Sequence, residues 1–336
     1  MQQIKVTASM LNIPTDTPSY VPSTAWMRHG PFAMWLVRAM QPRRIVELGT
    51  HHGYSYFCFC QAVEAENLAA DCFAVDTWAG DEHAGYYDDS VYAAVRAENE
   101  KYSRFSTLLK KTFAEALEDI PDASVDLLHV DGRHFYNDVR EDFESWIPKL
   151  SNRAIVLFHD TEVRERDFGV WRYWSELAPK HPSLNFTYQH GLGVLFWGEQ
   201  IADGLKSFVA LIDHEDSRTL ITEYFEAQGE AFVQRREQEQ LSQELTASVD
   251  RLRSELKVTQ QNLTELTSAL TSAQEELAGA RSELAQARRY PLRQLKAKME
   301  FKVLRLFAKA ERFISVEAAE RFRRSAMKRD PDRLGH

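Results

Sequence analysis

The chain has 336 residues, of which 44% are apolar, so it can bury one large core and still carry additional segments. Its net charge is −9, but the charge is unevenly distributed, because residues 291–336 hold 13 basic and six acidic residues. The rest of the chain is therefore strongly acidic, which argues against a nucleic-acid-binding core. Three cysteines do not suggest a secreted disulfide scaffold, and no run reaches the ~20 apolar residues of a membrane span.

Residues 1–42 are predicted to form a helical lead-in, and residues 43–199 alternate apolar runs with helical patterns. Near-continuous apolar runs, typical of strands buried on both faces of a parallel sheet, occur at residues 43–48, 72–76, 105–110, 125–131 and 153–160. Helical patterns fill the intervening segments 54–65, 90–101 and 137–150. The runs LNFTYQ and GVLFWG flank the turn HGLG and predict an antiparallel hairpin. The sequence therefore predicts an α/β domain with a doubly wound, mostly parallel seven-stranded sheet.

The first strand leads into the glycine-containing turn IVELGTHHGYS. Gly49 and Gly53 allow a nucleotide-like ligand to approach the backbone, but their spacing is not that of a dinucleotide site. This disfavours a nicotinamide oxidoreductase. Glu47 favours a ligand that carries positive charge, and Asp76 ends the second strand, where an acid can bind ribose hydroxyls. Together the two acids indicate S-adenosylmethionine.

Acids and histidines also follow the fourth and fifth predicted strands. Asp131 and His134 leave the fourth strand, and His159 and Asp160 leave the fifth. Because ligands of doubly wound sheets bind at the carboxyl ends of the strands, we expect these groups to converge near the reacting methyl group. His134 is predicted to be the general base for an acceptor hydroxyl. A divalent cation, Mg²⁺ or another, held by Asp131 and Asp160 would act by lowering the hydroxyl pKa.

Structural roles compete with these chemical ones. Asp131 is also placed to cap the helix that begins near His134. Adjacent residues of a strand point to opposite faces, so one of His159 and Asp160 is expected to face away from the cleft.

The segment DTWAGDEHAGYYDD follows the second strand and is rich in aromatic and polar side chains. We expect Trp78, Asp81 and His83, together with His159, to contact the acceptor, since aromatic faces and carboxylates suit a sugar. The alternative is a loop that packs against the later segment ERDFGVWRYW.

Residues from about 24 to 198 resemble class I S-adenosylmethionine-dependent methyltransferases, most closely methyltransferase domain family 24 and its sugar O-methyltransferase neighbours. VELGTHHGYSYF, LLHVDGRHFYNDVREDFESWIPKL and IVLFHDTEVRERDFGVWRYW carry the resemblance. It implies cofactor contacts from Glu47, Gly49 and Gly53 (methionine), Asp76 (ribose), and Thr112 and Phe113 (adenine). Metal-dependent relatives carry a further acid where this chain has His159. The N-terminus lacks the apolar core of a signal peptide, which together with the lack of a membrane-length apolar run predicts a cytoplasmic protein. The resemblance implies an O-methyltransferase of polysaccharide biosynthesis, acting on a saccharide or glycoconjugate hydroxyl.

The remaining segments are predicted to be helical. A connector at residues 200–237 leads to a heptad repeat at residues 238–289. One seam position holds Val249, Leu256, Leu263, Leu270, Leu277 and Leu284; the other holds Leu245, Leu252, Thr259, Leu266, Ala273, Ala280 and Ala287. The repeat predicts a homo-oligomeric coiled coil, a dimer or trimer, whereas the alternative is a single solvated helix.

Residues 290–336 are predicted to form a basic amphipathic helical tail. It suits either the inner face of an anionic membrane or a protein partner, such as its own oligomer or a glycan-assembly protein. A rival to the enzyme is a non-enzymatic coiled-coil scaffold with a methyltransferase-like recognition head. The intact glycine turn and strand-end acids favour the enzyme.

Overall fold

The computed structural model describes residues 17–288 and 302–306 of the chain. It divides into two compact units, Met1–Gln240 and Leu241–His336. Residues 1–16 of the predicted lead-in lie outside the described residues. The same holds for the predicted basic tail, except for a helical stretch at 302–306. Within the described ranges, none of the helices combines the length and hydropathy that a membrane-spanning segment needs.

A seven-stranded sheet forms the centre of the first unit, as predicted. Its strands are β1 (Arg44–Leu48), β2 (Asp71–Asp76), β5 (Ser106–Lys110), β6 (Val125–Val130), β7 (Leu150–His159), β8 (Ser183–Phe186) and β9 (Leu192–Phe196). The strand order is β5-β2-β1-β6-β7-β9-β8. The first five strands in that order pair in parallel, while β9 pairs antiparallel with both β7 and β8. The edge hairpin predicted from the turn HGLG is therefore confirmed.

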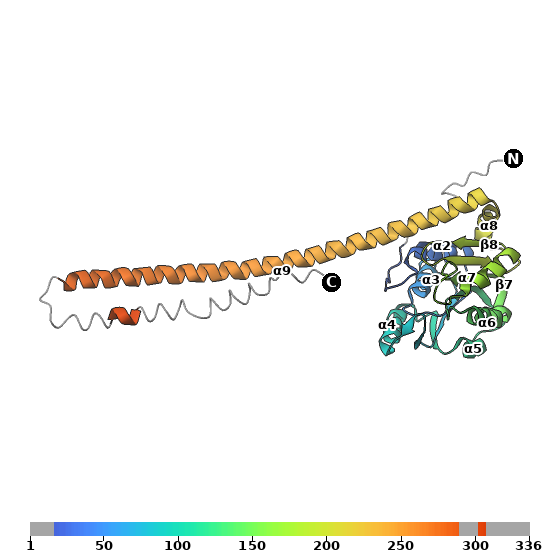
Figure 1. Ribbon diagram of the computed structural model, residues 1–336, viewed down its shortest axis with the longest axis horizontal. Helices are drawn as coiled ribbons and strands as arrows, with labels where there is room; N and C mark the ends of the chain where they lie inside the picture. The colour runs from blue at the N-terminus through green and yellow to red at the C-terminus, as the bar shows by residue number, and fades with distance from the viewer. Residues whose placement is uncertain (1–16, 289–301, 307–336) are drawn as a thin grey trace. The chain divides into compact units, whose positions relative to one another are not determined.

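Helices cover both faces of this sheet (Figure 1). They are α2 (Gly30–Met40), α3 (Tyr54–Ala65), α4 (Asp89–Asn99), α5 (Phe113–Ala116), α6 (Tyr136–Trp146), α7 (Val170–Leu177), α8 (Lys206–Ile212) and the start of the long helix α9 (Glu215–Ala287). Short 3₁₀ turns are η1 (Met27–His29), η2 (Glu100–Tyr102), η3 (Leu117–Asp119), η4 (Ile147–Lys149), η5 (Ala178–Lys180) and η6 (Asp203–Leu205). A small separate hairpin pairs β3 (Gly80–Asp81) with β4 (Gly85–Tyr86).

The alternation of side chains along each strand divides the core into two clusters. Ile45, Leu127 and Leu157 lie in the cluster that α2, α3, α4 and α8 cover. Val46 and Leu128 lie in the cluster that α5, α6 and α7 cover. Because successive residues of these strands are buried on opposite faces, apolar residues occupy both faces of each run. This explains why the sequence showed them so clearly.

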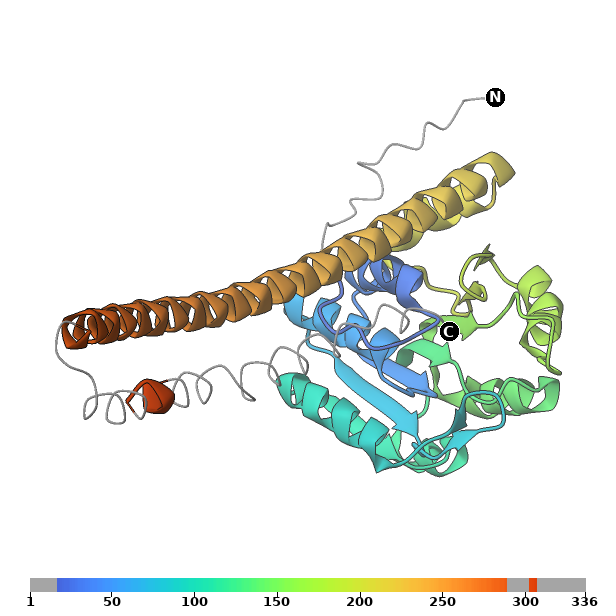
Figure 2. The same ribbon diagram turned by 60° about the vertical axis from the view of Figure 1, so that its left-hand side comes forward.

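The long helix α9 changes its surroundings along its length. Ile221, Phe225 and Phe232 are buried in the first core cluster, so the start of α9 belongs to the α/β unit. From Leu241 onward the side chains of α9 are almost all exposed. Both views show one uninterrupted helix (Figures 1 and 2). The predicted helix at 238–289 is confirmed through Ala287, and its assembly with other copies stays a prediction.

Candidate active site

The carboxyl ends of β1, β2, β6 and β7 open into a cavity of about 640 Å³. Its walls include the glycine turn, the segment after β2 and the polar residues that end β6 and β7. Another cavity, of about 820 Å³, lies at the amino ends of β1 and β7 and is lined by arginines and by residues 200–204. Of these two cavities, only the first is lined by histidines, and a cluster of acids lies beside them, which makes it the candidate active site.

The glycine turn is held against the end of β6. Gly49 has a φ of +89°, and a Cβ at this position would lie 2.0 Å from the carbonyl oxygen of Asp131. Gly53 also has a positive φ and forms the N-cap of α3. Both positions therefore require glycine, and both line the cavity, as expected of a ligand-binding turn.

Asp76 fixes the same turn through its carboxylate. One oxygen accepts hydrogen bonds from the backbone N–H groups of Thr50 and His51, both at 2.8 Å. The other oxygen accepts from the N–H of Trp78 at 2.6 Å. Asp76 lines the cavity at the predicted place, and its carboxylate already organises the walls around it.

Glu47 does not reach the cavity. It is fully buried, and its carboxylate lies 2.7 Å from Nδ1 of His129, which is equally buried on the neighbouring strand β6. Burial raises the pKa of Glu47, while the contact with His129 opposes that shift. The structure thus places Glu47 beneath the glycine turn rather than on its ligand-facing side.

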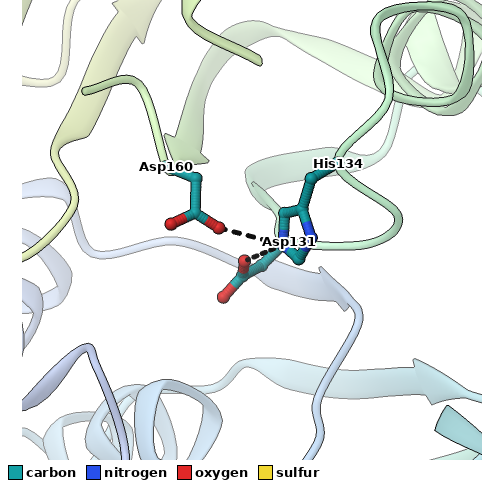
Figure 3. Close-up of side chains that lie close together, drawn as sticks. All are labelled: Asp131, His134 and Asp160. Atoms are coloured by element: carbon teal, nitrogen blue, oxygen red, sulfur yellow. Dashed lines mark ion pairs between the residues drawn. The ribbon is translucent and has the colours of Figure 1, made fainter. Parts of the chain in front are cut away.

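Two carboxylates and three histidines meet where β6 and β7 end. Nε2 of His134 lies 2.9 Å from Asp160 and 3.7 Å from Asp131 (Figure 3). Nδ1 of His159 lies 3.3 Å from Asp131, and Nδ1 of His190 lies 3.1 Å from Asp160. The structure therefore brings together all four strand-end residues selected from the sequence.

The charges of this cluster reinforce one another. Burial lowers the pKa of His134, but its hydrogen bonds to Asp131 and Asp160 and their negative charges outweigh burial and raise the pKa to about 9. The same carboxylates outweigh burial at His159 and raise its pKa well above the usual value. Burial also opposes ionisation of Asp160, yet the nearby histidines hold its pKa well below the usual range. The carboxylates and the imidazoles of the cluster thus favour each other's charged forms.

Two structural expectations for this cluster are wrong. Asp131 does not cap the next helix, because α6 begins after Phe135 and has no side-chain cap. His159 and Asp160 do not point to opposite sides, since both line the cavity. The physical reason is that Asp160 follows the last residue of β7 and has a φ of +61°. This left-handed conformation breaks the alternation of the strand.

Only some of the residues expected to contact the acceptor from the segment after β2 line the cavity. Trp78 is buried against Tyr92, its Nε1 donates to the carbonyl of His51, and it does not line the cavity. Asp81 and His83 do line it. Nε2 of His83 lies 2.8 Å from the Arg166 carbonyl, so the loop also packs against the later segment, as the alternative proposed.

The far end of the cavity lies beside α5 and α6. Thr112 and Phe113 line it, and Thr112 also caps α5 in a capping box with Glu115. Asp142 of α6 lines the same end, and burial together with the charges of Asp138 and Glu141 raises its pKa to about 7.

His190 is a site residue that was not selected from the sequence. It stands in the turn HGLG between β8 and β9, with a φ of +68°, and it contacts Asp160 from there. In the sequence, its position in the turn HGLG, directly before a glycine, was the one signal that could have indicated it.

The donor set of the cluster fits a divalent cation. One ligand atom each from Asp131, His134 and Asp160 lies within 4.8 Å of the others. Two carboxylates with one imidazole suit a first-row ion such as Mn²⁺ as well as Mg²⁺. The proton that the carboxylates stabilise on His134 shows that this position already favours positive charge.

Comparison with known proteins agrees with the resemblance that the sequence indicates. Residues 46–161 match the model of a family described as a methyltransferase domain, which confirms the predicted family for this part of the chain. An uncharacterized protein of Sinorhizobium fredii, y4gI, is 54% identical over 328 residues. That match covers 96% of this chain but 34% of the relative, so the chain spans about a third of the relative's length.

Solved structures of methyltransferases are also similar in part. The O-methyltransferase TomG from Streptomyces achromogenes, in complex with SAM, has 18% identity and a TM-score of 0.39. The match covers 59% of this chain and 93% of TomG. A methyltransferase from Geobacter sulfurreducens has 17% identity and a TM-score of 0.38, with coverage of 50% and 78%.

Proposed function

We propose that the chain is an S-adenosylmethionine-dependent O-methyltransferase that acts on a hydroxyl of a saccharide or glycoconjugate. The observation that carries this proposal is the convergence of the glycine turn with Asp131, His134 and Asp160 on one cavity. The turn offers backbone to a nucleoside, and the cluster offers groups that can activate a hydroxyl. The match of residues 46–161 to a methyltransferase domain supports the same reaction class.

The proposed reaction is an in-line displacement. The acceptor oxygen forms a bond to the methyl carbon, the carbon–sulfur bond breaks, and the electron pair goes to the positively charged sulfur. The hydroxyl proton must leave, and His134 is the proposed base because its Nε2 faces the cavity cluster. Its second nitrogen, Nδ1, is buried without a hydrogen-bond partner among the described residues, which leaves Nε2 for proton transfer.

The raised pKa of His134 makes a second component necessary. At neutral pH, His134 between two uncompensated carboxylates carries a proton and cannot accept another. A divalent cation held by Asp131 and Asp160 would neutralise them and polarise the acceptor hydroxyl. We therefore propose that the two aspartates hold the cation and that His134, freed of its proton, is the base.

The saccharide assignment rests on the lining of the cavity. Asp81 and His83 lie on one wall, and the ring of Phe168, which also lines the cavity, has its centroid 4.4 Å from that of the His83 ring. Carboxylates beside aromatic faces offer both hydrogen-bond acceptors and a flat apolar surface. A polyhydroxylated ring uses both.

Calorimetry with S-adenosylhomocysteine tests the cofactor assignment. Wild type should bind, and Asp76→Ala should lose binding because the backbone of the turn and of Trp78 loses its anchor. Asp71→Ala, at the exposed opposite end of β2, is the control and should bind as wild type does. Absence of binding to the wild-type protein would remove the enzymatic assignment and leave the scaffold.

Separate measurements of Mn²⁺ binding and methyl transfer test the roles at the cluster. Asp131→Ala and Asp160→Ala should lose Mn²⁺ binding. His134→Ala should keep Mn²⁺ and S-adenosylhomocysteine binding but lose turnover on a saccharide panel. Loss of Mn²⁺ binding in His134→Ala would make this histidine a ligand instead of the base.

A further inference from the structure

The seam of α9 leaves a continuous apolar surface exposed. The eight leucines at its seam positions between Leu245 and Leu284 are each 39–64% exposed. A stripe of this length is unusual on a monomeric protein and indicates a partner surface. The repeat of seven residues matches another helix with the same repeat.

The residues that flank this seam carry separated charges. Positions just before the first seam residue of each heptad form the acidic flank, whose charged members are Glu255, Glu276 and Glu283. Positions just after the second seam residue form the basic flank, whose charged members are Arg253, Arg281 and Arg288. The acidic flank contains no base and the basic flank contains no acid over residues 245–288.

This separation distinguishes the two orientations of a paired copy. In a parallel pair, the acidic flank of one helix faces the basic flank of the other, five residues further along the sequence. Glu276 then faces Arg281 and Glu283 faces Arg288, with no like charges opposed. In an antiparallel pair each flank faces itself, so every charged contact would join two acids or two bases. The charges therefore favour the parallel arrangement.

Contacts within one chain leave the main pair available. Neither Glu276 nor Arg281 has an ion-pair partner among residues 17–288 and 302–306. Glu283 does lie 3.1 Å from Lys302, so Glu276 and Arg281 are the cleaner pair for a test. Residues five apart do not face each other on one helix, and any coupling between these two must come from a second chain.

We propose that residues 245–287 of α9 bind a second copy of this chain as a parallel, in-register coiled coil. The apolar seam supplies the association, and the Glu276–Arg281 contact sets the direction. Each chain enters the seam from its α/β unit, whose core includes the start of α9. A parallel pair therefore carries both α/β units at the same end of the coiled coil.

Cysteine cross-linking of the full chain tests the direction. Leu252→Cys and Ala280→Cys place a thiol at seam positions near the two ends, and the three native cysteines are buried. In a parallel in-register pair, each variant should form a disulfide-linked dimer under mild oxidation. Ser254→Cys, two residues past the seam, is the control and should cross-link poorly. An antiparallel pair has a single centre and cannot link both variants to their own copies, so that result would overturn the proposal.

Charge exchange tests the contact. Glu276→Arg and Arg281→Glu should each weaken association several-fold in sedimentation experiments, whereas the double variant should restore it. Binding of S-adenosylhomocysteine should not change in any of them, which shows that the domain stays folded. A monomeric wild-type chain would overturn the proposal, as would double-variant association no stronger than that of the single variants.

Discussion

The side chains at the carboxyl edge of the sheet and those along the seam of α9 differ in how far contacts within one chain cover them. At the sheet edge, the carboxylate of Asp160 is buried and that of Asp131 is half-buried, and histidines of the same chain contact both. Along the seam, leucines are exposed, and nothing in the described residues covers them. One region is complete within a single chain and needs only a small ligand. The other would be covered by a second helix in the proposed parallel pair.

The largest effect on stability is expected at the sheet edge, from Gly49→Ala. The new Cβ would overlap the Asp131 carbonyl in a left-handed backbone conformation, so we expect about 3 kcal/mol of destabilisation and loss of S-adenosylhomocysteine binding. Urea unfolding and calorimetry measure the two effects. Gly85→Ala shares the positive φ but meets nothing within 4 Å, and it should cost about 1 kcal/mol. Equal effects of both variants would show that the turn does not depend on this contact.

A pH dependence is expected from His134. Its folded pKa of about 9 exceeds the unfolded value, so its stabilising contribution is complete below pH ~6.5 and is lost as pH rises through ~9. In the presence of a chelator, we compare the free energy of unfolding of wild type with that of His134→Gln. The difference between them should shrink by on the order of 3 kcal/mol from pH 6 to pH 10. His214→Gln, at an exposed position, is the control. A difference that is constant with pH would contradict the proposed charge pairing.

A smaller effect of opposite sign is expected from Asp142→Asn. The folded pKa of Asp142, about 7, lies above its unfolded value, so ionisation costs stability increasingly between pH ~4 and ~7. The variant should be more stable than wild type by about 2 kcal/mol above pH 7 and nearly equal at pH 4. Thermal unfolding at both pH values measures this difference. A stability gain of the variant that is larger at pH 4 than at pH 8 would contradict the raised pKa.

The smallest effect on stability is expected from a substitution on α9. Gly279 lies on α9 outside the seam, and an added Cβ meets nothing within 4 Å. Gly279→Ala should stabilise the helix by about 1 kcal/mol through its higher helix propensity. Circular dichroism during thermal unfolding detects this gain, while S-adenosylhomocysteine affinity should not change. A changed affinity would show that the two regions are coupled.

The sequence predicts the sheet and its helices well because their patterns are local. The strands β1, β2, β5 and β6 are short apolar runs, and α3 spans the predicted residues 54–65. Strand β7 begins three residues before the predicted run, where burial is less regular. The small β3–β4 hairpin was not predicted, since two-residue strands leave no periodic pattern.

The site is only partly predictable because its details depend on backbone conformation and on distant contacts. Asp131 and His134 follow a recognisable strand, so their meeting could be inferred. The turn of Asp160 to the cavity depends on a positive φ that no pattern shows. His190 arrives from a turn 30 residues further along the chain, and the burial of Trp78 depends on Tyr92 and on the carbonyl of His51.

The carboxylate of Asp76 has a consequence for the kinetics of ligand binding. Three backbone N–H groups already hold the turn and the start of the next segment to it in the free protein. A nucleoside therefore meets preformed walls, and little additional conformational entropy is lost when it binds. Association should proceed in one fast phase without an ordering step. Differences in affinity among variants outside this clamp should then appear mainly in the dissociation rate.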